Sequence, residues 1–293
     1  MSDLNESNVM TANADHADND DNDDNDDNDD NDDSKYIINV KTVQSGAFRV
    51  LVESLKEILT DTNITFDEEG IKLIATDNSH IVLIHMRLSA PKFEHYYCDK
   101  KTVIGVNMMN MFKLIKTMGN NDTLTLFIEK DNPNKLGIRI NNVDKKSQTT
   151  FKLNLLDISD DEIVIPPAKF ETELTLPSAD FQKIIRDMTN IGENIDIKSV
   201  GSTLMLNCEG DFANQETVMC ETQNGLNFSK SAGLEKPIQG IFSLKYLLLF
   251  TKCTNLCNLI HMYIKNDYPL VIRYDVANLG HIKLCLSPNT ETN

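Results

Sequence analysis

Residues 45–73 read SGAFRVLVESLKEILTDTNITFDEEGIKL, and this stretch contains the unit on which the whole fold is built. Apolar residues in its first half recur every three to four positions, which predicts an amphipathic helix from Ser45 to Leu59 with Ser45 as its N-cap. In the second half they alternate with polar residues, first over Ile64–Phe66 and again over Ile71–Leu73. The turn at Asp67–Gly70 joins these two runs, so the helix is expected to lead into a β-hairpin.

The same unit recurs three more times along the chain. The later helices are expected to begin near Asn107, Ser178 and Ser243, and each is followed by two alternating runs joined by a turn. Four such units predict an α+β fold of two duplicated domains, each with two helices on antiparallel sheets, and not a parallel doubly wound fold. The expected divisions are an acidic tail at 1–35, domains at 36–154 and 171–293, and a connector at 155–170.

The connector combines acidic residues with one apolar cluster. Acids break the strand pattern of LLDISDDEIVIPP (155–167), and a proline pair ends it, so the segment is expected to be exposed. Ile163, Val164 and Ile165 are unusual in such a linker. Either they pack on their own domain or they form the lip of a binding groove.

Most of the negative charge lies in the N-terminal segment. Residues 1–34 carry 14 Asp and Glu and no Lys or Arg, and Asp18–Asp33 repeats Asp-Asp-Asn. Such a run has nothing to bury, so it is expected to be disordered, either as a solubilising tail or as a device against stray nucleic-acid contact. The remaining 31 acids and 28 bases leave a nearly neutral body on which a basic surface could still be segregated.

The composition argues against several other classes of protein. No apolar run is long enough for a membrane span, and no signal peptide is recognisable. The six cysteines are expected to be reduced and mostly buried, and Cys253 and Cys257 have no second pair with which to hold a metal. Glycine-rich phosphate loops, nucleophile elbows and zinc-protease motifs are missing. The chain is therefore predicted to be non-enzymatic, with no cofactor and no metal.

Basic residues recur on one face of each predicted helix. They are spaced three or seven apart, which returns a side chain to the same side of a helix. One such pair is ordinary for a solvated helix, but four equivalent pairs predict a single positive surface for sequence-independent contact with DNA phosphates. The pairs are Arg49 and Lys56, Lys113 and Lys116, Lys183 and Arg186, and Lys245 and Lys252.

Short motifs between Val40 and Pro288 resemble the proliferating cell nuclear antigen family. The matching stretches keep their order and spacing over nearly everything beyond the tail. They are Leu73–His80 (LIATDNSH), Tyr97–Asp99 (YCD), Gly105–Asn107 (GVN), Phe181–Asp187 (FQKIIRD) with Ile191–Gly192 (IG), Tyr246–Lys252 (YLLLFTK), Tyr268–Leu270 (YPL), Gly280–Lys283 (GHIK) and Leu286–Pro288 (LSP).

This resemblance implies a sliding clamp for DNA polymerase. It implies a head-to-tail homotrimer whose helices line a hole around duplex DNA, and the family's DNA-facing positions fall on the eight basic residues named above. Subunit contacts map to residues 147–154, including Phe151, and to residues 214–221. A ring of this kind implies an ATP-dependent clamp loader as partner and the site of DNA replication as location, in a nucleus or a viral replication compartment.

The resemblance also implies a groove for peptides of DNA polymerase and other proteins with clamp-binding motifs. Two positions depart from the family: Cys285 stands where an aromatic is usual, and Thr76 where a methionine is usual. Gly201 stands where the family has its regulatory lysine, with Lys198 nearby. The groove positions are His80, Ile81, Leu83, Ile163, Ile165, Pro166, Pro269, Ser287 and Pro288.

Two other functions stay open on the sequence alone. The chain could be a clamp-fold subunit of a checkpoint-type hetero-ring, or a monomeric processivity factor. Alternatively, its function could lie in the acidic tail, as a nucleic-acid mimic or a chaperone-like protein. Oligomeric mass separates the first alternative from a homotrimer, and tail deletion separates the second.

Overall fold

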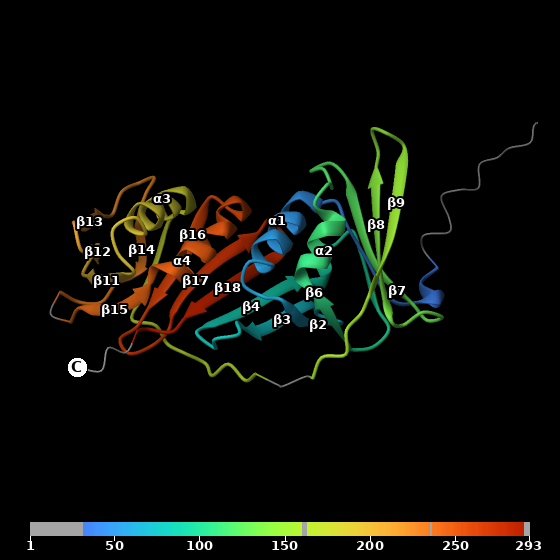
Figure 1. The fold of residues 1–293 in the computed structure, drawn as a ribbon, viewed down its shortest axis with the longest axis horizontal. Coiled ribbons are helices and arrows are strands. Elements are labelled where there is room, and N and C mark those ends of the chain that lie inside the picture. The colour runs from blue at the N-terminus through green and yellow to red at the C-terminus, as the bar shows by residue number, and fades with distance from the viewer. Residues whose placement is uncertain (1–31, 160–162, 235, 290–293) are drawn as a thin grey trace, which may run out of the picture. The chain divides into compact units, whose positions relative to one another are not determined.

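A computed structural model describes residues 32–159, 163–234 and 236–289. By its internal contacts the chain divides into a short N-terminal unit, Met1–Asp33, and a large unit, Ser34–Asn293. The large unit contains all the helices and strands discussed below (Figure 1). The expectation of a disordered acidic tail concerns residues that lie, except for the last few, outside the described part of the chain.

The first half of the large unit contains nine strands and two helices, together with the short 3₁₀ turn η3 (Ala90–Lys92); another 3₁₀ turn, η2 (Asp33–Lys35), precedes the first strand. In chain order the elements are β1 (Tyr36–Thr42), α1 (Ser45–Leu55), β2 (Asp61–Asp67), β3 (Gly70–Thr76), β4 (Val82–Ser89), β5 (His95–Cys98), β6 (Thr102–Asn107), α2 (Met108–Ile115), β7 (Thr123–Glu129), β8 (Lys135–Asn142) and β9 (Ser147–Asn154).

The second half repeats this order after the connector. Its elements are β10 (Thr172–Pro177), α3 (Ser178–Met188), β11 (Asn194–Val200), β12 (Thr203–Glu209), β13 (Asn214–Cys220), β14 (Asn227–Lys230), β15 (Ile238–Ser243), α4 (Leu244–Phe250), η4 (Thr251–Leu256), β16 (Leu259–Ile264), β17 (Leu270–Val276) and β18 (Gly280–Leu286). By position in this order, β10 corresponds to β1, β11–β15 correspond to β2–β6, and β16–β18 correspond to β7–β9.

The strands form three antiparallel sheets. One has five strands in the order β5-β1-β7-β8-β9, and another has four in the order β13-β12-β11-β15. The third has nine, β14-β10-β16-β17-β18-β4-β3-β2-β6, and it joins the two halves of the chain where β18 pairs with β4 from Gly280↔Leu88 to Leu286↔Val82. The two domains expected from the sequence thus share a continuous sheet.

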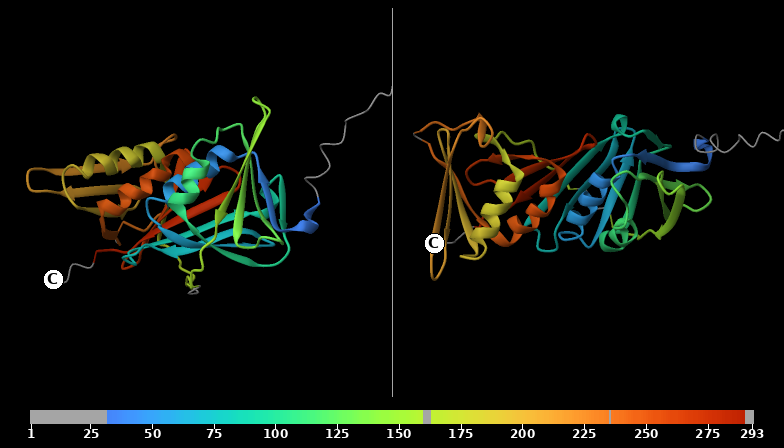
Figure 2. Two further views of the ribbon diagram at one scale, coloured as in Figure 1. Left: turned by 45° about the vertical axis from the view of Figure 1, so that its right-hand side comes forward. Right: turned by 90° about the horizontal axis from the view of Figure 1, so that it is seen from above.

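The helices cover one side of this sheet. Figures 1 and 2 show α3, α4, α1 and α2 in a row on the same side. Hydrogen bonds hold the middle of the row together: Ser54 Oγ on α1 donates to Lys252 O at 3.0 Å, and Gln182 Nε2 on α3 donates to Thr251 O at 3.0 Å. Apolar side chains such as Leu51, Phe181 and Leu247 fill the space between helices and sheets.

The start of α1 differs from expectation, whereas the β2–β3 turn has the glycine that its backbone conformation requires. Ser45 is not the N-cap of α1, because Gln44 precedes the helix and makes no capping hydrogen bond. The buried Ser45 hydroxyl instead donates to Gly119 O at 2.9 Å, so it ties α1 to the loop after α2. At the β2–β3 turn Gly70 has φ +138°, and a Cβ there would come within 1.9 Å of Leu88 O.

The cysteines also depart from expectation. All six lie in the described residues and are free thiols, but Cys208 and Cys253 alone are buried. Cys98, Cys257 and Cys285 are partly exposed, and Cys220 on the edge strand β13 is exposed. Burial raises the pKa of the Cys253 thiol to about 12, which keeps it protonated at neutral pH.

Candidate nucleic-acid and partner-binding surfaces

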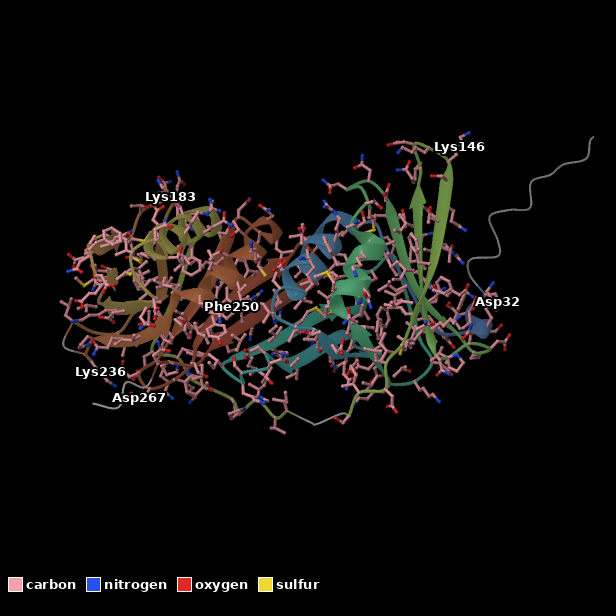
Figure 3. All side chains as sticks on the ribbon, viewed as in Figure 1. Asp32, Lys146, Lys183, Lys236, Phe250 and Asp267 are labelled. Carbon is pink, nitrogen blue, oxygen red and sulfur yellow. The ribbon has the colours of Figure 1, made fainter. Side chains whose placement is uncertain are left out.

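Six of the eight predicted DNA-binding residues are exposed on the helix row. Buried residues at three- and four-residue spacing, such as Met111 and Ile115 on α2, fix which side of each helix faces the core, so the basic residues between them face away. Figure 3 shows Lys183 standing out from α3. The six exposed residues are Lys113 and Lys116 on α2 and its end, Lys183 and Arg186 on α3, Lys245 on α4 and Lys252 on η4.

The other two, Arg49 and Lys56, are partly engaged within the protein. The Lys56 side chain is only 12% exposed, pairs with Glu57 and lies 4.9 Å above the ring of Phe112 on α2. Arg49 donates from Nη2 to Asn120 Oδ1 at 3.4 Å. Arg49 lies on α1 and Lys56 is the C-cap residue of this helix, in the middle of the row, so both add positive potential there but have less freedom to reach a phosphate.

A groove of about 730 Å³ lies on the opposite side of the nine-stranded sheet, where the connector passes over it. Four of the predicted groove residues line it: Leu83, Ile165, Pro166 and Pro269. Val164 in the connector also lines it and is 78% exposed. Of the two roles considered for the connector's apolar cluster, its position favours the lip of a groove.

Three further predicted residues lie at one end of the groove, beyond its lining. Ser287 N donates to Ile81 O at 3.0 Å, which extends the β18–β4 pairing by one step toward His80. His80 has φ 56°, and its Nδ1 lies 3.1 Å from Thr76 Oγ1. Ile163 and Pro288 are not among the residues that line the groove.

The sequence did not reveal the aromatic wall of this groove. The ring of Phe170 lies 5.4 Å from that of Tyr263 and 5.7 Å from that of Tyr268, and Lys265 Nζ is 5.1 Å from the Tyr268 ring. Tyr263 alternates along β16 with the buried Met262 and Ile264, so its outward orientation could have been predicted. The position of Phe170 depends on the path of the connector, for which no local signal exists.

The predicted subunit-contact strands are both sheet edges. β9 ends the five-stranded sheet and β13 ends the four-stranded one. Phe151 on β9 is half-buried, pairs with Ile138 across the ladder and packs on the domain core. On β13, Val218 is 52% exposed. Each edge leaves backbone donors and acceptors available for a further strand.

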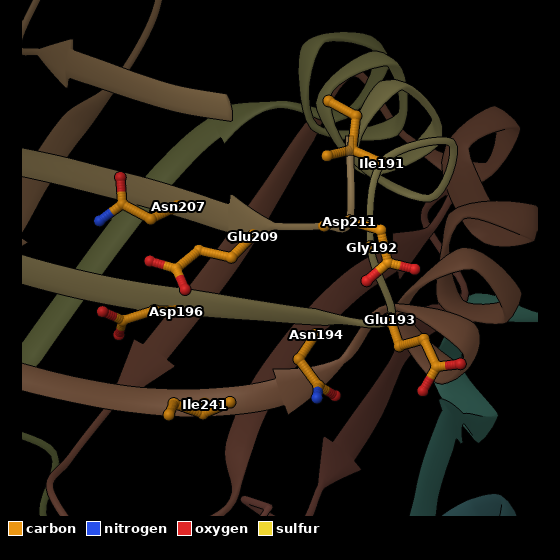
Figure 4. A pocket seen from close by; sticks show the side chains of 10 residues that line it. Ile191, Gly192, Glu193, Asn194, Asp196, Asn207, Glu209, Asp211 and Ile241 are labelled. Atoms are coloured by element: carbon orange, nitrogen blue, oxygen red, sulfur yellow. The ribbon is translucent and has the colours of Figure 1, made fainter. Parts of the chain in front are cut away.

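An acidic hollow on the four-stranded sheet was also not predicted. It has a volume of about 680 Å³, and Glu193, Asp196, Glu209 and Asp211 surround it (Figure 4). Burial raises the pKa of the Asp196 carboxyl, and Lys198 partly offsets this effect. In the described part of the chain no group of three or more His, Cys, Asp or Glu side chains is placed to hold a metal ion.

Comparison with known proteins identifies the family. Residues 37–162 match the proliferating cell nuclear antigen N-terminal domain, and residues 164–289 match its C-terminal domain. The chain is 32% identical over 256 residues to the "Probable DNA polymerase sliding clamp 1" of Paramecium bursaria Chlorella virus 1, covering 86% of this chain and 97% of that protein. The protein belongs to the proliferating cell nuclear antigen family of DNA sliding clamps.

Membership in this family confirms the expected fold of two duplicated clamp domains with antiparallel sheets. Sliding clamps of this family are processivity factors and not enzymes. None of the helices in the described residues is long and apolar enough to cross a membrane.

Proposed function

We propose that three copies of the chain close head-to-tail into a ring around duplex DNA, with the helix row facing the DNA. The observation that carries this proposal is the presence of six exposed basic residues on α2, α3, α4 and η4, away from the side of the helix row that packs on the core. Phosphate contacts of this kind are independent of sequence and exchange readily. A closed ring does not need tight binding, since it leaves DNA only by opening or by reaching an end.

The strand order supports the head-to-tail assembly. Within the chain, β18 and β4 join a five-strand half to a four-strand half. Their equivalents in the duplicated order are β9, the edge of the five-stranded sheet, and β13, the edge of the four-stranded sheet. Pairing β9 of one copy with β13 of the next would therefore build a second nine-stranded sheet of the same composition, and a repeated heterologous contact of this kind can close into a ring.

Charge on the two edges is complementary. The turn before β9 carries exposed Lys145 and Lys146, whereas Lys152 on β9 is paired with Glu129 at 2.6 Å; on the other edge, exposed Glu216 of β13 pairs across the ladder with Asn207, which lines the acidic hollow. Opposite charges on the two edges favour contact between unlike edges over contact between like ones. This argues for a homomeric ring over a hetero-ring or a monomer.

Partner proteins would bind the ring at the groove. An apolar cleft beside an exposed connector suits a short segment that buries aliphatic and aromatic anchors, and DNA polymerase and other clamp-binding proteins would dock there. Docking on a ring that encircles DNA holds the polymerase at high effective concentration near the primer end, at the site of replication. Because the ring must be opened to enclose circular DNA, it requires a separate ATP-dependent clamp loader.

Retention on circular DNA tests the proposal. Native mass measurement should give three times the 33.1 kDa chain mass. Protein loaded on a nicked circular plasmid by a clamp loader with ATP should co-elute with the plasmid and be released when a single restriction cut linearises it. Blocking both ends with bound streptavidin should restore retention. Equal retention on circular and open linear plasmid would contradict encirclement, and a single-chain mass would favour the monomeric alternative.

A further inference from the structure

The outward face of the nine-stranded sheet carries two parallel rows of side chains beside the groove. The apolar row runs across five strands: Tyr263, Val271, Cys285, Leu83 and Thr76 are direct cross-strand neighbours in turn. The basic row lies two residues further along each strand and contains His261, Arg273, Lys283 and His85. Two residues of strand separate the rows by roughly 7 Å.

The two cations of the basic row differ in their pairing. Arg273 is bound to Asp275 Oδ1 from both Nε (3.0 Å) and Nη2 (2.7 Å). Lys283, which lines the groove and is half-buried, has no hydrogen bond or ion pair with any of the described residues. Its cross-strand neighbours are Arg273 on one side and His85 on the other, so the nearest charged neighbour in the row is also a cation.

Burial is the main cause of the lowered pKa of the surrounding histidines, and the nearby positive charges lower it further. Burial, and then the charges of Lys283 and Arg87, lower the pKa of His85. The pKa of His281 is lowered to about 4, first by burial and then by Arg273, Lys283 and His85, with Asp275 opposing. Two other carboxylates on this face do not neutralise Lys283. Glu69 is already bound to Arg87 and Lys72, and Glu173 lies three strands away from Lys283.

We propose that the segments docked in this groove carry, next to their apolar anchors, an acidic side chain that pairs with Lys283. The inference rests on the proposed partner docking and adds its charge preference. Anchors seated on the apolar row place the adjacent residue of the segment within reach of the basic row. A carboxylate there supplies the counter-charge that half-buried Lys283 lacks and also lies beside His85.

Peptide pairs provide the test. Each peptide would have one aliphatic and two aromatic anchors and a single Glu, placed at a different flanking position in each peptide of the series. Calorimetric titration of the full chain would compare every such peptide with the same peptide carrying Gln in place of Glu. At one position Glu should bind about fivefold tighter than Gln at low salt, as expected for a partly exposed ion pair. Lys283→Gln should reduce the ratio of Glu-peptide to Gln-peptide affinity to one, whatever its effect on the two affinities themselves, and Lys283→Arg should retain the preference. Lys72→Gln, on the same face but already paired with Asp67 and Glu69, is the matched control.

The outcomes separate the inference from the proposed function. Tight binding with equal affinity for Glu and Gln peptides at every position would overturn the inference and leave the groove intact. A Glu preference that survives in Lys283→Gln would do the same. The groove assignment itself fails if neither peptide binds, or if Leu83→Ser binds both peptides as tightly as the wild type does. The inference then fails with it.

Discussion

Reversing Lys113, Lys183 and Lys252 to Glu should weaken DNA binding and flatten its dependence on salt. These three exposed residues come from α2, α3 and η4, so they sample both ends of the helix row and the segment that follows α4. Each phosphate contact contributes about 0.9 to the slope of log affinity against log salt, and three contribute about 2.7. A fourfold rise in salt, from about 50 to 200 mM, then costs about 40-fold in affinity through these contacts, and about 3.5-fold through one of them.

The assay is fluorescence anisotropy with a short duplex over this salt range, on the wild type, the three single variants and the triple variant. Thermal midpoints should stay unchanged, because all three side chains are exposed and none forms a hydrogen bond or ion pair with another described residue. A control triple reverses Lys101, Lys130 and Lys236, which are exposed but lie off the helix row, and should keep the wild-type slope. The assignment of the helix row to DNA is refuted if the helix triple keeps the wild-type slope, or if the control triple loses as much.

Three more predictions test the other surfaces. Phe151→Ala should shift the native mass from three chains toward one at micromolar concentration, since it loosens the edge strand β9; an unchanged trimer would remove Phe151 from the seam. Leu83→Ser with Ile165→Ser should reduce binding of an apolar clamp-binding peptide at least tenfold while the native mass stays constant, and wild-type affinity in calorimetry would place the groove elsewhere. The lowered pKa of His281 means that the unfolded chain takes up a proton near pH 6.5 and the folded chain only near 4. Stability should therefore fall as pH drops from about 6.5 to 4, and His281→Gln should make that fall shallower in thermal melts; identical pH profiles would contradict this account.

Local periodicity explains why so much of the fold could be predicted. Alternation over Ile64–Phe66 and Ile71–Leu73 and the turn at Asp67–Gly70 correspond to β2, β3 and the tight turn between them. The outward faces of the helices could be predicted equally well, since spacings of three and seven depend only on the helical repeat. The helix ends could be predicted less well. Helix α1 ends at Leu55 and not at Leu59, and Ser45 forms a long-range hydrogen bond where a local cap was expected.

Features that depend on long-range pairing could not be predicted. The engagement of Lys56 requires Phe112 of another helix to lie beside α1, and the aromatic wall requires the connector to bring Phe170 to Tyr263. The pairing of β18 with β4 joins segments nearly 200 residues apart, and no local pattern specifies which sheet edges meet. That pairing places His85 beside Lys283, whereas Arg273 faces Lys283 across the β17–β18 hairpin, so only half of the surroundings of Lys283 depends on the long-range contact.

The nine-stranded sheet lies between the helix row proposed to face DNA and the groove proposed to bind partners. Along β4, Val82, Ile84 and Met86 point into the core beneath the helices, while Leu83 and His85 point to the groove side. Because alternate residues of the same strand point to opposite faces, a segment bound in the groove would make its contacts without displacing any side chain of the helix row proposed to face DNA. The groove lies partly on strands from each half of the chain, so its shape depends on the β18–β4 junction. If β9 and β13 form the equivalent junction between copies, the same kind of strand pairing both holds the ring together and builds its partner site.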